Sequence, residues 1–172
     1  MANSKLRGVI AAVATAVDEA GAPDAARSTR LARFLLDTGC DGLNVLGTTG
    51  EATSFSLEQR KAVMTAYKGA GLPLDRLMVG TGAAATADAV ALTRHAADLG
   101  FAAALILPPF YYKGVPDDGL AAYIGTIVKA TLAHIHNDPA WAHVAPPLAP
   151  FSAADRASAV AGYDAARAKR VA

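Results

Sequence analysis

Short apolar runs alternate along the chain with longer stretches in which apolar residues recur at helical spacing. The apolar runs predict buried strands at residues 8–14, 42–46, 76–80 and 102–107. The periodic stretches predict helices at residues 24–37, 57–69, 86–99 and 116–129. Strands and helices in this order predict an α/β fold with a parallel sheet and right-handed crossovers.

Local signals at the helix termini support these boundaries. Ser56 and Gln59 are spaced as a capping box at the start of the second helix, and Thr86 is the expected N-cap of the third. Gly39 and Gly100 stand where the first and third helices are expected to end. The boundaries therefore rest on backbone chemistry as well as on the spacing of apolar residues.

The strand–helix unit repeats four times within residues 8–131, which is about 31 residues per unit. Eight such units would need about 250 residues, the usual size of a (β/α)₈ barrel. We therefore expect a partial TIM barrel that consists of four βα units of a (β/α)₈ barrel plus a C-terminal helix. A small open doubly wound sheet is the alternative.

The repeat stops after residue 131. Residues 132–151 contain three histidines and several prolines but no apolar run of strand length. Ser152 then begins a predicted last helix that extends to about residue 169. The expected organisation is a half barrel at residues 1–131, followed by a loop and a C-terminal helix at residues 132–172.

Composition narrows the class of protein. Of the 172 residues 53% are hydrophobic and 18% are charged, and the net charge is +1. These values suit a globular domain and favour neither nucleic acid nor a membrane as a partner. The single cysteine, Cys40, cannot form an internal disulfide, so we expect a cytoplasmic protein. Lys5 and Arg7 could instead begin a signal peptide, but the apolar stretch after them suits a buried strand equally well.

The candidate chemistry lies in the turn Gly47-Thr48-Thr49-Gly50, which follows the second predicted strand. Glycine lets a backbone approach a ligand closely, and two adjacent hydroxyls can hold a carboxylate or relay a proton. The turn is therefore a candidate oxyanion site. Alternatively, the two threonines could satisfy backbone groups of the turn itself.

A second motif, Pro108-Pro109-Phe110-Tyr111-Tyr112, follows the fourth predicted strand. With the threonine turn, it resembles the dihydrodipicolinate synthase / N-acetylneuraminate lyase family of pyruvate-dependent aldolases. The resemblance implies a lyase that condenses pyruvate with an aldehyde through a Schiff base on a lysine and needs no cofactor. Pyruvate or a similar keto acid, and further copies of the chain in a homo-oligomer, are the implied partners.

The resemblance also implies roles for individual residues. Thr48 would be the hydroxyl of a proton relay, and Tyr112 would complete that relay in a neighbouring subunit. Thr49 would bind the keto-acid carboxylate, together with Gly47 and Gly50. Packing with one wet edge is the alternative role for Tyr112.

Residues 146–152 resemble a segment near the C-terminus of the same family. The resemblance thus falls into two blocks with a seam near residues 130–132, and it implies that the fifth to eighth barrel strands are absent. The family's tyrosine motif and substrate-binding arginine near the fifth strand, and its Schiff-base lysine on the sixth, then have no counterpart here.

The lysines decide what chemistry to expect, because class I aldolases need an amine in the active site to form the iminium that serves as electron sink. None of the six lysines falls in a predicted strand, and only Lys113 lies in a loop on the face where barrel active sites form. We therefore expect the chain alone to be inactive or impaired. The alternative is a non-catalytic deletion product that acts, if at all, by association with itself or with full-length homologues.

Two further patterns support weaker hypotheses. Residues 80–85 fit a loose dinucleotide motif, but the next predicted strand lacks the acidic residue that a Rossmann site requires. His134, His136, Asp138 and His143 could bind a metal, although no clear strand fixes their geometry. We therefore expect neither a nucleotide cofactor nor a metal site.

Overall fold

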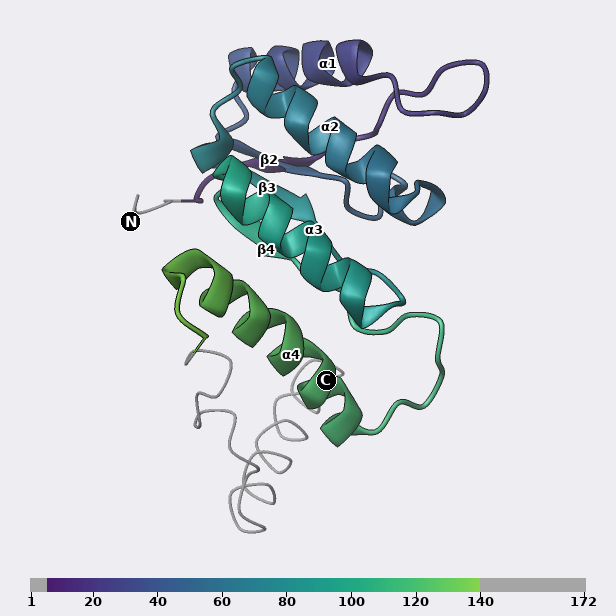
Figure 1. Ribbon diagram of the computed structural model, residues 1–172. Helices are drawn as coiled ribbons and strands as arrows, with labels where there is room; N and C mark the ends of the chain where they lie inside the picture. Colours follow the sequence, from purple (N-terminus) through teal and green to yellow (C-terminus); the bar gives the residue numbers. More distant parts are fainter. Residues whose placement is uncertain (1–5, 140–172) are drawn as a thin grey trace, which may run out of the picture. The chain divides into compact units, whose positions relative to one another are not determined.

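The computed structural model describes residues 6–139. One parallel sheet contains, in chain order, β1 (Ile10–Ala12), β2 (Gly42–Val45), β3 (Leu77–Gly80) and β4 (Ala103–Leu105). The strands are followed in turn by α1 (Ala25–Asp37), α2 (Leu57–Gly69), α3 (Thr86–Leu99) and α4 (Asp117–His136) (Figure 1). The four strand–helix units confirm the predicted partial barrel. The predicted last helix at residues 152–169 lies outside the described residues.

The helix boundaries follow the capping chemistry closely. Asp24 accepts a hydrogen bond from the Arg27 N–H at the start of α1, and Ser56 and Gln59 form the predicted capping box of α2. Gly100 ends α3 in the left-handed conformation, with φ of 96°. The predicted N-cap of α3 is wrong: Thr86 is the first helical residue, and Ala85 before it makes no side-chain cap.

Helix α4 is longer than predicted, because it continues through residue 131 and ends at His136. Asn137, in the left-handed conformation with φ of 48°, ends the helix. The expected loop therefore does not begin at residue 132. Leu132, Ala133 and Ile135 continue the helix, because leucine and alanine favour helix and the nearby prolines lie beyond its end.

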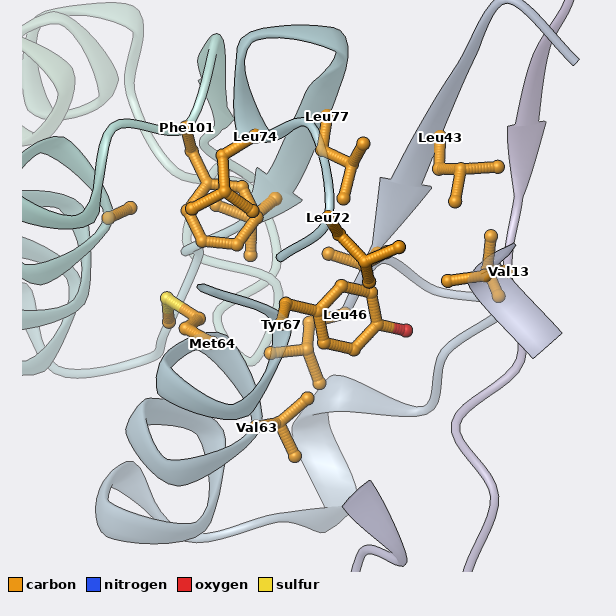
Figure 2. Packing of buried hydrophobic residues seen from close by; sticks show 14 of the residues in the cluster. Val13, Leu43, Leu46, Val63, Met64, Tyr67, Leu72, Leu74, Leu77 and Phe101 are labelled. Carbon is orange, nitrogen blue, oxygen red and sulfur yellow. The ribbon is translucent and has the colours of Figure 1, made fainter. Parts of the chain in front are cut away.

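One face of the sheet packs against α1, α2 and α3. Figure 2 shows this core from close by, with Tyr67 of α2 lying near Leu46 and Leu72. The core-facing strand positions are alternate residues, as the strand period requires; on β2 and β3 they are Leu43, Val45, Leu77 and Val79. Helix α4 packs instead on α3, through Tyr123 and Ile127 against Ala89.

The opposite face of the sheet carries a row of paired residues that are less well covered. Ala12 pairs with Asn44, Asn44 with Met78, and Met78 with Ala103, so the row crosses all four strands. Ala12 is exposed and the other three are only half-buried. We call this set of four residues the open row. Among residues 6–139, no helix combines the length and the apolarity required to cross a bilayer.

Candidate functional site

The threonine turn lies at the carboxyl edge of the sheet, directly after β2. Two non-glycine residues in the left-handed region flank it, since Leu46 and Glu51 both have φ of 51°. A branched, buried leucine rarely adopts this conformation, which costs about 1–2 kcal/mol. Strain of this kind persists only where the surrounding contacts fix the backbone, and it is common at functional sites.

Several contacts hold the turn in place. The N–H of Glu51 donates to the carbonyl of Thr48 at 3.1 Å, and the hydroxyl of Thr15 donates to the carbonyl of Gly50 at 2.8 Å. A Cβ added to Gly50 would lie 3.0 Å from the carbonyl oxygen of Val13. The chain after β1 therefore packs directly against the turn, and Gly50 permits the close approach.

Thr48 and Thr49 are both exposed. Within the described part of the chain, neither hydroxyl makes a hydrogen bond to another residue, so the alternative role of satisfying the turn is not observed. Thr48 lines a cleft of about 60 Å³, which is enough for a carboxylate group. The remaining walls come from the ends of β2, β3 and β4, from the segment between β2 and α2, and from α2 itself: Leu46, Gly47, Ala52, Thr53, Arg60, Gly80, Gly82, Leu105 and Leu107.

Arg60 of α2 is the wall residue that we did not predict from the sequence. Its side chain is 5% exposed, and burial lowers the pKa of the guanidinium while Asp88 raises it. A signal was present, because Arg60 precedes the buried Met64 by four residues and Tyr67 by seven. It therefore occupies an apolar-face position of the helix.

Tyr112 lies apart from this cleft, in the segment between β4 and α4. Its side chain is 65% exposed and makes an edge-on contact with the ring of Tyr111, with centroids 5.5 Å apart. It lines a separate open hollow of about 460 Å³, beside Lys113 and Tyr123. The two hollows share no wall residue, so Tyr112 and Thr48 do not meet within one described site.

Similarity to known proteins shows the family of this chain. A sequence model of the Dihydrodipicolinate synthetase family matches residues 5–142. The chain belongs to this family. The 4-hydroxy-tetrahydrodipicolinate synthase of Parasynechococcus marenigrum is 41% identical over 122 residues, which are 71% of this chain and 40% of that enzyme. The resemblance drawn from the threonine turn and the tyrosine motif is confirmed.

Solved structures of the family share the fold. The N-acetylneuraminate lyase of Proteus mirabilis aligns with 78% of this chain and 44% of its own, at 33% identity and a TM-score of 0.65. The dihydrodipicolinate synthase of Acinetobacter baumannii, solved in complex with pyruvate, aligns with 73% of this chain and 43% of its own, at 31% identity and a TM-score of 0.65. The chain thus spans about 40% of the length of its curated relatives.

The described lysines do not reach the cleft beside Thr48. Four fall within residues 6–139, and none of them is a wall residue of that cleft. Lys61 pairs with Glu58 at 3.1 Å on the surface of α2, and Lys113 lines the other hollow. The described part of the cleft therefore contains no lysine that could serve as the Schiff-base amine expected from the resemblance.

The two weaker patterns have structural roles in the described residues. His134 contacts Asp98 at 2.6 Å on the surface of α4, and residues 6–139 contain no cluster of three or more metal-binding side chains. His143 lies outside the described residues. In the glycine-rich loop, Thr93 donates to the hydroxyl of Thr81 at 2.8 Å, and Tyr123 donates to the carbonyl of Ala83 at 2.7 Å. Side chains of α3 and α4 therefore anchor this loop.

Proposed function

We propose that the chain binds the carboxylate of pyruvate or a similar α-keto acid at the threonine turn. We propose also that the chain alone does not carry out the Schiff-base chemistry of its family. The observation that carries both statements is a cleft that is lined by Thr48, whose hydroxyl makes no hydrogen bond within residues 6–139, and by no described lysine. The site is therefore suited to reversible binding of an anion.

The chemistry of the turn supports carboxylate binding. Thr48 and Thr49 each offer a hydroxyl donor, and Gly47 lines the cleft beside Thr48, where it adds no side chain that would obstruct a ligand. Hydrogen bonds to a charged acceptor contribute about 1.5–3 kcal/mol each. Pyruvate is bound by the related Acinetobacter baumannii enzyme, which supports a keto acid as the ligand here.

The missing amine supports the second statement. Attack on the ketone requires an uncharged lysine held within reach of the carbonyl carbon, with its pKa lowered by its surroundings. Lys113 is exposed, and it lines a hollow to which Thr48 contributes no wall. It does not replace a lysine from the wall of a complete barrel.

Ligand-observed NMR with pyruvate tests the binding proposal. We expect the wild-type chain to bind pyruvate, Thr48→Val to weaken binding by about tenfold, and Thr48→Ser to restore it. Thr126→Val is the matched control, because Thr126 is exposed on α4 and its hydroxyl bonds only within the helix, to the carbonyl of Ala122. Equal affinities in the wild type and Thr48→Val would contradict the proposed site.

The second candidate function is non-catalytic self-association, and the open row favours it. In the sheet order, β1 and β4 are the two edge strands, and each has one described neighbour. Unpaired strand edges tend to pair with another chain. Two copies of a four-stranded sheet contain as many strands as one closed (β/α)₈ barrel. We propose this assembly as the form in which a deletion product of the family would cover its open face.

A further inference from the structure

Arg60 carries a positive charge into the interior without a matching acid. Its side chain is 5% exposed, and no described carboxylate lies within ion-pair distance of it. Burying an unpaired charge is costly, so such residues are normally paired or bound to a ligand. Asp88 of α3 and Tyr123 of α4 interact with it electrostatically but form no ion pair with it.

Backbone carbonyls hold the guanidinium in place. Nη1 donates to the carbonyl of Gly82 at 3.0 Å, and Nη2 donates to the carbonyl of Gly80 at 2.9 Å. The third nitrogen of the guanidinium, Nε, is buried and has no hydrogen-bond partner within residues 6–139. Two neutral carbonyls compensate only part of the charge, so a net positive potential remains at this point.

The same contacts connect Arg60 to the threonine turn. Gly80 packs so tightly against the end of β2 that an added Cβ would lie 1.9 Å from the carbonyl oxygen of Leu46. A Cβ on Gly82 would lie 2.8 Å from the Cβ of Leu107, which follows β4. By holding both glycine carbonyls, Arg60 fixes the end of β3 between the other two walls of the cleft.

We propose that Arg60 is the positioning residue and the fixed charge that makes the cleft beside Thr48 a site for one carboxylate-sized anion. The identity of that anion as a keto-acid carboxylate rests on the proposed function. The positive charge acts from the wall of a small, largely apolar cleft, where screening by water is weak. The Thr48 donor then orients the anion, and Arg60 supplies the preference for negative charge.

Charged and neutral ligands of the same shape separate this role from a purely structural one. We would measure the affinities of pyruvate, its neutral analogue pyruvamide, and formate by ligand-observed NMR. The wild type should prefer pyruvate to pyruvamide by about tenfold or more. Arg60→Gln should lose that preference, whereas Arg60→Lys should keep it at neutral pH.

Arg76→Gln is the matched control. Arg76 also donates to two carbonyls, those of Asp41 at 2.7 Å and Cys40 at 3.0 Å, but it lies at the amino edge of β3, away from the cleft. Arg76→Gln should therefore lower stability without changing the preference for the charged ligand. A folded Arg60→Gln that still prefers pyruvate as the wild type does would overturn the proposal.

A pH profile keeps the proposal testable if Arg60→Gln does not fold. A buried lysine loses its proton at a lower pH than an arginine, so the preference should disappear on alkaline titration of Arg60→Lys but persist in the wild type. The charged and titratable neighbours of Arg60 are Asp88 and Tyr123. Both proteins contain them, so their titration affects the two pH profiles equally. Identical profiles in the two proteins would refute a role for the charge.

The formate measurements separate this proposal from the proposed function. Formate binding that depends on Arg60, without pyruvate binding, would support the anion site and reject the keto acid as its ligand. Pyruvate binding that is indifferent to Arg60 would support the keto acid and reject the role of the arginine.

Discussion

Tyr67 illustrates how much a single buried residue contributes to the core. Its side chain is 2% exposed and lies among apolar residues of the main core (Figure 2). The hydroxyl has only a long contact, 3.4 Å, to the carbonyl of Ser28. Burial therefore raises the pKa of Tyr67 to about 12.

This pKa predicts a loss of stability in alkali. The pKa of Tyr67 is about 10 in the unfolded chain and higher in the folded protein. The stability that the protonated hydroxyl contributes is therefore fully present below pH 10 and is lost as the pH rises towards 12. Tyr67→Phe should remove about 2–3 kcal/mol of that alkaline loss. Urea unfolding at several pH values measures it, with Tyr111→Phe at an exposed position as control. An unchanged alkaline slope in Tyr67→Phe would refute the assignment.

At the scale of elements, the sequence predicts best where backbone chemistry marks both ends. Helix α2 has the predicted bounds because Ser56 and Gln59 form its capping box. The predicted end of α4 is wrong, because no glycine marks the true end. Asn137 ends the helix in the left-handed conformation instead. The conformation of Leu46 could not be predicted either, since leucine normally avoids positive φ and tertiary contacts impose it here.

In the candidate site, too, local features could be predicted from the sequence and tertiary contacts could not. The threonine turn was visible in the sequence because its glycines and its place after a strand are local features. The burial of Arg60 could not be seen in the sequence, because only the packing of α2 against β3 brings its guanidinium to the carbonyls of Gly80 and Gly82. The hollow that Tyr112 lines likewise depends on how the segment after β4 folds.

In the turn after β2, a substitution by glycine should stabilise the protein, which is unusual. Glu51 is exposed and has φ of 51°, so Glu51→Gly should relieve strain and raise the free energy of unfolding by about 1 kcal/mol. Ala62→Gly is the matched control, because Ala62 is exposed in the middle of α2. Glycine at this position should lower the free energy of unfolding by about 1 kcal/mol. Urea denaturation measures both. Destabilisation by Glu51→Gly would show that the turn does not require the left-handed conformation.

At the scale of the molecule, the open row is the feature that the fold leaves incomplete. It crosses all four strands on the face opposite α1, α2 and α3. In a closed barrel the same face would point inward and be filled by side chains. Within residues 6–139, no further strand covers these residues.

We predict that the chain self-associates through the open row. Met78→Glu should produce monomers, because a carboxylate at the centre of this row is costly to bury. Ala62→Glu, on the exposed surface of α2, should leave the assembly unchanged. Size-exclusion chromatography with light scattering measures the mass, and circular dichroism verifies folding. A wild-type monomer that unfolds cooperatively would contradict this prediction.

The most direct test of the whole account is reductive trapping with pyruvate. Borohydride converts a Schiff base into a stable secondary amine, which intact-mass spectrometry detects on the protein. With pyruvate and borohydride together, we predict an unmodified chain, because no described lysine lines the cleft beside Thr48. A full-length relative treated in parallel should gain the adduct. A stoichiometric pyruvyl adduct on this chain would contradict the account.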